Sequence, residues 1–188
     1  MTASAVVWLV MSLGLMLTEL RLSARGARST VTVEARASDE ILIILTMLAL
    51  ILPVSLSLVS SDLGTPTLPT MAVGALSAGV GLSLRCAAMV GLRGRYRLSP
   101  TVQPDHTTLI TDGPFAQLRH PGYAGLLLAF GGLSLVAAGW VGLVFVAPMG
   151  LAVHHRITLE ERLLALEFSD LHAAYCRSVP WRMLPHVY

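Results

Sequence analysis

Long apolar runs alternate with short polar segments along the 188 residues of this chain. A helix needs about 20 mostly apolar residues to cross the hydrocarbon core of a bilayer. Three runs have that length, at about residues 3–20, 41–59 and 68–90. A fourth, at about residues 123–153, is too long for one span and short for two. Small residues beside Gly139, near its middle, predict a tight helical hairpin there, so the pattern predicts five transmembrane helices.

The placement of arginine tests this number of spans independently. Twelve of the thirteen basic residues, all of them Arg, lie in three polar segments: 21–36, 93–119 and 156–182. The other two connections, residues 60–66 and the Gly139 corner, contain none. By the positive-inside rule, this alternation predicts an N-terminus outside and a cytoplasmic C-terminus. A single long tilted helix in place of the hairpin would put the C-terminal arginines outside, so five spans are favoured.

Composition agrees with lipid as the main solvent. The chain is 54% hydrophobic and 13% charged, with a mean hydropathy of +0.70, whereas about 25% charged residues are usual in a soluble domain. Its arginines form no dense patch with interleaved aromatics, which argues against a nucleic-acid partner. Cys86 and Cys176 belong to no CxxC pair, and no spacing fits a zinc or iron site. Residues 1–17 lack the basic start of a cleavable signal and predict a first span.

The other polar segments are predicted to be cytoplasmic. The loop before the fourth span has a strong turn signal at residues 112–114, Asp-Gly-Pro. The tail from His154 is predicted to form an amphipathic helix that ends at residues 179–180, Val-Pro. Gly74 and Gly81 form a small-residue face, which would serve packing within one chain as readily as dimerisation. The prediction is an all-α membrane protein with a cytoplasmic loop and a C-terminal amphipathic helix.

Residues 119–123, Arg-His-Pro-Gly-Tyr, are the first candidate for chemistry. Pro121 can be the first residue of a helix, where its missing N–H costs nothing. Arg119 and His120 then stand before a helix N-terminus, whose free N–H groups and dipole suit an anion such as a carboxylate. Gly125, in the same region, would let a ligand or a neighbouring helix come close. The alternative is an interfacial anchor, since Arg, His and Tyr are all common at headgroup level.

Two further candidates lie on the same side of the membrane. Arg156 and Glu160 are i, i+4 neighbours after the fifth span, so an exposed salt bridge is one interpretation. Alternatively, Arg156 clamps a carboxylate, while Glu160 or Glu161 holds an amine or sulfonium ligand. Arg85 lies inside the third apolar run, where a guanidinium is costly and must pair, snorkel or face a polar cavity.

Together these segments resemble the isoprenylcysteine carboxyl methyltransferase family, from about residue 85 to the C-terminus. The matching blocks, in order, are Arg85-Cys86-Ala87-Ala88-Met89, Gly94-Arg95-Tyr96, Leu109-Ile110-Thr111-Asp112-Gly113-Pro114-Phe115, Arg119-His120-Pro121-Gly122-Tyr123-Ala124-Gly125, Arg156 with Glu160-Glu161 and Leu164, Tyr175, Val179-Pro180 and Leu184-Pro185. Two positions depart from the family pattern: Phe115 stands where Tyr is usual, and Ser169 where Gly often follows Phe. The first two spans carry no recognisable part of the resemblance.

The resemblance implies S-adenosylmethionine as cofactor on the cytoplasmic side, and a lipophilic or prenylated substrate that enters laterally from the bilayer. Arg85 and Arg156 would face the substrate carboxylate as the catalytic pair. The residues implied at the cofactor are Arg119, His120, Tyr123, Gly125, Glu160 and Glu161. Residues 68–188 would be the methyltransferase core, and residues 1–67 two further helices with a basic cytoplasmic loop, in a bacterial plasma membrane.

Other functions stay open at this point. A carboxylate acceptor needs no general base, whereas a lipid phenol or quinone-like lipid would need one, and His120 or a Glu would have to serve. A membrane sterol or steroid reductase using NADPH has a similar Arg-His-Pro-x-Tyr-x-Gly block. Such reductases usually carry Asn before the Tyr and an acid after the Gly, where this chain has Gly122 and Leu126. A non-enzymatic scaffold would leave the ordered polar residues between Arg85 and Glu161 unexplained.

Overall fold

The computed structural model describes residues 10, 12–14, 33–59, 65–92 and 109–187, and these ranges contain helices and no strand. The elements are α2 (Val33–Val59), α3 (Leu68–Gly91), η1 (Gly113–Ala116), α4 (Pro121–Ala138), η2 (Gly139–Phe145) and α5 (Ala147–Ser178). The chain then continues as an irregular C-terminal segment, residues 179–187. Most of the predicted first span and most of the two basic loops before α2 and η1 fall outside the described residues.

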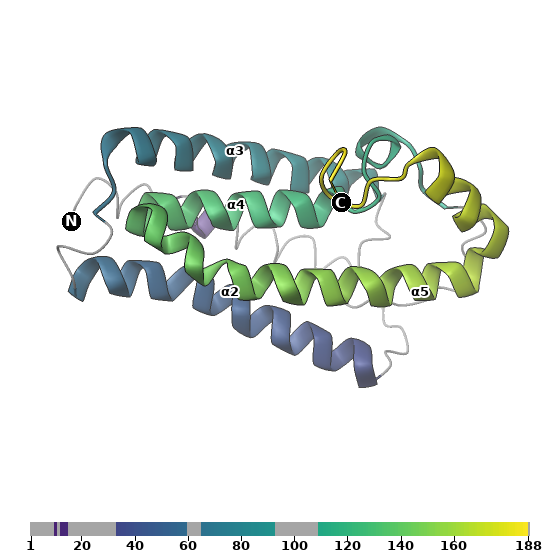
Figure 1. The fold of residues 1–188 in the computed structure, drawn as a ribbon, viewed down its shortest axis with the longest axis horizontal. Helices are drawn as coiled ribbons and strands as arrows, with labels where there is room; N and C mark the ends of the chain where they lie inside the picture. Colours follow the sequence, from purple (N-terminus) through teal and green to yellow (C-terminus); the bar gives the residue numbers. More distant parts are fainter. Residues whose placement is uncertain (1–9, 11, 15–32, 60–64, 93–108, 188) are drawn as a thin grey trace.

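Helix α4 is the centre of the bundle (Figure 1). It packs along α3 on one side, also contacts α2 and α5, and is buried over most of its length. Gly139 ends α4 with φ 56°, a conformation that favours glycine. After η2 the chain runs back as α5, opposite in direction to α4 (Figure 1). The bundle therefore brings the start of α4 close to the middle of α5.

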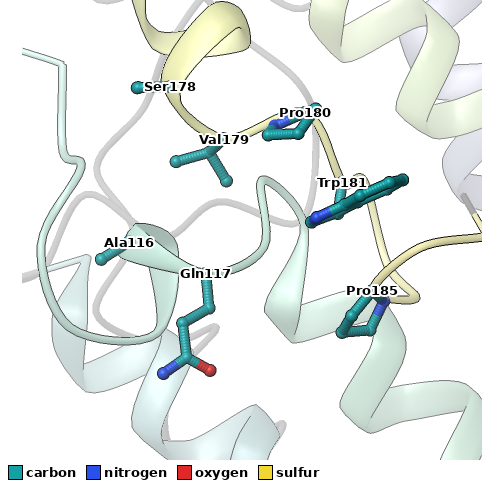
Figure 2. Close-up of a pocket in the computed structure, with 7 residues that line it drawn as sticks. All are labelled: Ala116, Gln117, Ser178, Val179, Pro180, Trp181 and Pro185. Carbon is teal, nitrogen blue, oxygen red and sulfur yellow. The ribbon is translucent and has the colours of Figure 1, made fainter.

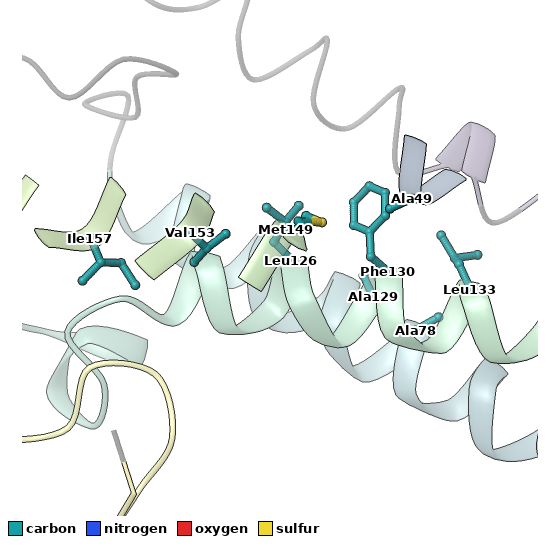
Figure 3. Close-up of a cluster of buried hydrophobic side chains, with 9 residues drawn as sticks. All are labelled: Ala49, Ala78, Leu126, Ala129, Phe130, Leu133, Met149, Val153 and Ile157. Carbon is teal, nitrogen blue, oxygen red and sulfur yellow. The ribbon is translucent and has the colours of Figure 1, made fainter. Parts of the chain in front are cut away.

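The apolar core lies between these helices (Figure 3). Leu126, Phe130 and Leu133 of α4 meet Met149 and Val153 of α5, and each is at most 4% exposed. Phe130, Met149 and Val153 are fully buried. This contact fixes how far α5 lies from α4, and so positions the polar residues at the start of α4 against those in the middle of α5.

Two of the described helical segments are long and apolar enough to cross a bilayer: Leu68–Gly91 and Pro121–Phe145. The first matches the predicted third span closely. The apolar part of α2, Glu40–Leu56, is shorter than the span predicted there. Five spans, and a hairpin in which α4 and α5 both cross the membrane, stay predictions.

Glycines allow α3 and α4 to touch backbone to backbone. A Cβ atom on Gly81 would lie 2.6 Å from the Gly125 carbonyl oxygen, and one on Gly125 would lie 2.6 Å from the Arg85 amide nitrogen. A Cβ on Gly74 would lie 2.7 Å from the Gly132 carbonyl oxygen. The small-residue face of α3 therefore packs within the chain, the first of the two uses expected for it.

Gly81→Ala is expected to destabilise the bundle by about 1–3 kcal/mol, because the new methyl must push α3 away from α4. Gly79→Ala, on the same helix, is the matched control, since a Cβ there meets nothing within 4 Å. Thermal unfolding of the two variants in detergent measures the difference. Equal midpoints for both variants would contradict this description of the interface.

Helix α5 bends sharply at Ser169, whose φ of 36° and ψ of −105° are not helical. The bend turns residues 170–178 back toward η1 and the start of α4 (Figure 1). A side chain strains this left-handed backbone, which glycine adopts freely. The departure from the family pattern noted at this position therefore places a strained residue at the bend.

Ser169→Gly is expected to stabilise the protein by about 1 kcal/mol, because it removes the Cβ that strains the bend. Ser169→Ala keeps the Cβ and should give no such gain. The measurement is again the thermal midpoint of the purified protein. A Ser169→Gly variant less stable than the parent would show that the serine side chain contributes more than the strain costs.

Candidate functional site

Three predicted arginines from separate segments meet at the start of α4. Arg85 of α3 donates from Nη1 to the Gly122 carbonyl oxygen at 2.9 Å. Arg156 of α5 donates from Nε to the hydroxyl of Tyr123 at 2.6 Å. Arg119 immediately precedes the helix. Arg85 and Arg156 are only 5% and 3% exposed, so both guanidinium groups are held inside the bundle rather than on its surface.

The helix begins at Pro121, as the sequence predicts, with His120 as its N-cap. The amides of Tyr123 and Ala124 both donate to the His120 carbonyl oxygen, each at 3.2 Å. These two donors are therefore used within the chain. We expected several free N–H groups to converge on an anion here, and for Tyr123 and Ala124 this is wrong. Their amides bond to the carbonyl oxygen of the N-cap residue, His120.

Tyr123 links two of the predicted site residues. Its hydroxyl accepts the hydrogen bond from Arg156 and donates to Oε2 of Glu160 at 3.1 Å. The ring of His120 lies 5.9 Å from the ring of Tyr123, centroid to centroid. Spacing suggested that Arg156 pairs directly with Glu160, but the Tyr123 hydroxyl of α4 bridges the two side chains. This bridge fixes the position of both charged groups.

Glu161 is the centre of a second cluster. Its Oε1 accepts from Nε of Arg119 at 2.9 Å, and its Oε2 lies 2.7 Å from Nη2 of Arg182. Nε2 of His120 is 3.4 Å from Oε1. At that distance the His120 contact is electrostatic, because Nε2 has no well-aligned hydrogen-bond partner among the described residues. Glu161 is therefore engaged by neighbouring cations, whereas Glu160 has Tyr123.

Charge neighbours control the ionisation of Glu161. Burial by itself would raise its pKa, but His120 and the two arginines outweigh burial and lower the pKa from 4.5 to about 2. The carboxylate therefore stays ionised throughout the physiological range. Because the lowered pKa belongs to the folded state, ionised Glu161 stabilises the fold above pH 4.5, and this stabilisation is lost as the pH falls toward 2.

Glu161→Gln should therefore lower the thermal midpoint of the protein at neutral pH. The difference from the parent should shrink as the pH falls from 4.5 toward 2, where the parent carboxyl is protonated as well. Glu167→Gln is the control, since Glu167 lies on the same helix and makes no ion pair with any residue that the structure describes. A difference that stays constant with pH for Glu161→Gln would contradict the ion-pair cluster.

The C-terminal segment closes over this cluster. The amides of Arg119 and His120 donate to the carbonyl oxygens of Trp181 and Arg182 at 2.9 and 2.8 Å. The hydroxyl of Tyr175 donates to the Phe115 carbonyl oxygen at 2.7 Å, and burial raises the Tyr175 pKa to about 12, so the phenol remains a donor. These bonds fasten the last turns of α5 and the segment after it to the residues before α4.

The structure specifies what Gly125 approaches and gives Arg182 a contact that the sequence did not predict. Gly125 faces the backbone of α3, so the neighbouring helix, and not a ligand, is what its missing side chain admits in this structure. From the sequence, Arg182 was only one of the arginines that indicate topology, whereas the structure places it on Glu161. In the sequence, Arg182 stands two residues after the family-like Val179-Pro180 block, and this position does not indicate which residue it contacts.

A shallow pocket of about 320 Å³ lies beside the site (Figure 2). It is lined by Ala116, Gln117, Ser178, Val179, Pro180, Trp181 and Pro185. None of the predicted catalytic or cofactor residues lines this pocket. We therefore locate the candidate site by its charged cluster and not by this hollow.

Comparison with known proteins agrees with the motifs. Residues 75–166 match the model of the Isoprenylcysteine carboxyl methyltransferase (ICMT) family. The chain is 33% identical over 104 residues to "Protein-S-isoprenylcysteine O-methyltransferase" of Schizosaccharomyces pombe, which is 54% of this chain and 44% of that protein. The chain thus spans less than half the length of this curated relative. The resemblance seen in the sequence is therefore confirmed over residues 75–166.

Proposed function

We propose that this protein transfers a methyl group from S-adenosylmethionine to the carboxylate of an isoprenylcysteine-like lipid. The observation that carries the proposal is where the family match lies. Its residues, 75–166, include every predicted catalytic and cofactor residue. In the fold, these residues gather around the first turn of α4. The name of the fission-yeast relative supports the same reaction for the matched region.

The residues around His120 fit an adenosyl cofactor with a charged amino-acid end. Nε2 of His120 is buried and has no hydrogen-bond partner among the described residues, so it can serve a ligand. The Glu160 carboxylate, held by Tyr123, suits an amine or a sulfonium. We propose His120, Tyr123 and Glu160 as the principal cofactor residues, with Arg119 and Glu161 supporting them. The cofactor would supply an electrophilic methyl group on a sulfonium.

Arg85 and Arg156 would orient the substrate carboxylate. Both are buried guanidinium groups at the start of α4, one bonded to Gly122 and the other to Tyr123. The carboxylate is already anionic at neutral pH, so no group in the chain has to remove a proton. What the chain supplies is alignment of two partly desolvated reactants, and such positioning can contribute about 7 kcal/mol or more.

A bilayer is the proposed surrounding. Leu76, Val80 and Val90 of α3 are 61–72% exposed, and Ile44 and Ile51 of α2 are 57% and 55% exposed. Such faces are costly in water and suited to lipid. Trp140, 64% exposed beyond the end of α4, matches the preference of tryptophan for the membrane interface. We propose an integral membrane protein of a plasma membrane, with the site on the cytoplasmic side and the lipid substrate entering from the bilayer.

Methyl transfer to a synthetic acceptor tests the proposal. Membranes containing the protein are incubated with methyl-labelled S-adenosylmethionine and N-acetylated S-farnesylcysteine, a small lipid thioether that carries one free carboxylate. Label should appear in a base-labile methyl ester. The methyl ester of the same compound, whose carboxylate is blocked, is the matched control and should take up no label. Equal labelling of both compounds, or labelling of a lipid phenol instead, would overturn carboxyl methylation.

A further inference from the structure

The backbone of Arg182 is hydrogen-bonded to the backbone of His120. The His120 amide donates to the Arg182 carbonyl oxygen at 2.8 Å, and the neighbouring Arg119 amide donates to Trp181. Nη1 of Arg119 also donates to the Val179 carbonyl oxygen at 3.2 Å. The C-terminal segment is therefore fastened to the peptide that bears the candidate cofactor histidine.

The side chain of Arg182 returns to the same place by another route. Its Nη2 lies 2.7 Å from Oε2 of Glu161, while the other carboxylate oxygen, Oε1, faces Arg119 and His120. The side chain of Glu161 is only 12% exposed and that of His120 only 5%. The division of the two oxygens between opposite neighbours holds the plane of the carboxylate, and the carboxylate in turn faces the buried His120 ring.

We propose that Arg182 is a positioning residue: by holding Oε2 of Glu161, it sets the carboxylate that orients His120 toward the cofactor. This inference rests on the proposed function, because it takes Nε2 of His120, which has no hydrogen-bond partner among the described residues, to be a cofactor contact. An ion pair between two exposed side chains contributes little to stability or binding. Arg182 is 31% exposed, but the side chain of its partner is only 12% exposed, so loss of Arg182 leaves a largely shielded carboxylate with one cation fewer.

A double-mutant cycle tests whether Arg182 acts through Glu161. The dissociation constant of S-adenosylhomocysteine is measured for the parent, Arg182→Gln, Glu161→Gln and the double variant. We expect Arg182→Gln to weaken binding about tenfold, as for loss of one hydrogen bond to a charged group. The double variant should be no weaker than Glu161→Gln alone. Arg177→Gln, which removes an exposed arginine just before the same segment, should bind like the parent.

A pH profile separates positioning from simple loss of stability. The groups that face Glu161 are Arg119, His120, His172 and Arg182. Arg182 is one of the groups that lower the Glu161 pKa. Its removal should therefore move the acid limb of the pH profile of ligand binding to higher pH, and Arg182→Lys should show a smaller shift. If Arg182→Gln does not fold, Arg182→Lys is measured in its place.

The outcomes are distinct. Additive losses in the cycle, or an unshifted acid limb, would overturn the positioning role while leaving the proposed function in place. Absence of S-adenosylhomocysteine binding by the parent protein would overturn the proposed function and this inference with it.

Discussion

Arg156→Ala is expected to reduce methyl transfer by roughly 10²-fold, the cost of misplacing a reacting group by about 1 Å. Arg156 is 3% exposed and donates to the Tyr123 hydroxyl at 2.6 Å, so its guanidinium has a fixed place beside the first turn of α4. Cofactor binding should be largely kept, because Tyr123 retains Glu160 as a partner. The turnover number and the dissociation constant of S-adenosylhomocysteine, measured on the same preparation, separate the two effects.

Two companion variants sharpen this experiment. Arg162→Ala removes an exposed arginine from the same helix and should turn over like the parent. Arg156→Lys keeps the charge but not the planar two-pronged guanidinium, so it should recover only part of the activity. Normal turnover by Arg156→Ala with an accepted substrate would show that this residue does not hold the carboxylate.

His120→Ala is expected to weaken cofactor binding by about tenfold or more, the usual cost of a lost hydrogen bond to a charged ligand. The reason is the position of Nε2, which is buried and has no hydrogen-bond partner among the described residues. Glu161 would then lose one of its charge contacts as well. Calorimetric titration with S-adenosylhomocysteine measures the change.

His155→Ala is the matched control for this second prediction, since His155 is exposed on α5 and should leave the affinity unchanged. Thermal midpoints of both variants show whether a change in affinity reflects loss of the fold. If His120→Ala bound the ligand as tightly as the parent while remaining folded, the histidine could not be a cofactor residue.

Local signals in the sequence predicted the ends of the helices well. Pro121 begins α4, because proline is favoured at a first helical position. The last helix ends at Ser178, just before the Val179-Pro180 pair that predicted its end. Helix α3, Leu68–Gly91, extends the predicted apolar run by one residue. Each of these features depends on residues within a turn or two of the boundary.

Contacts between distant segments were harder to foresee. Spacing suggested that Arg156 pairs with Glu160, but the hydroxyl of Tyr123, on another helix, stands between them. The pairing of Arg182 with Glu161 joins residues that no periodic pattern relates. The bend at Ser169 likewise contradicts the helical spacing around it. Tertiary packing decides the two pairings, which no local spacing marks. For the bend, the one local sign was that the resembled family often has Gly at this position.

For the glycines too, the sequence predicted a local feature but not the distant segment that it contacts. Gly74, Gly81 and Gly125 were recognised as places where something comes close. Whether that neighbour is a ligand, a second chain or another helix depends on the packing of α3 against α4, and the structure shows that it is a helix of the same chain. Composition could identify the close approach but not its partner.

We propose above all that the residues around the start of α4 hold an adenosyl cofactor. The most direct test of this proposal is titration of the purified protein with S-adenosylmethionine, S-adenosylhomocysteine and NADPH. Both adenosyl ligands should bind saturably, below about 1 mM as for ordinary substrates, and NADPH should show no saturable binding. Saturable binding of NADPH, without binding of either adenosyl ligand, would contradict the account and point to reductase chemistry.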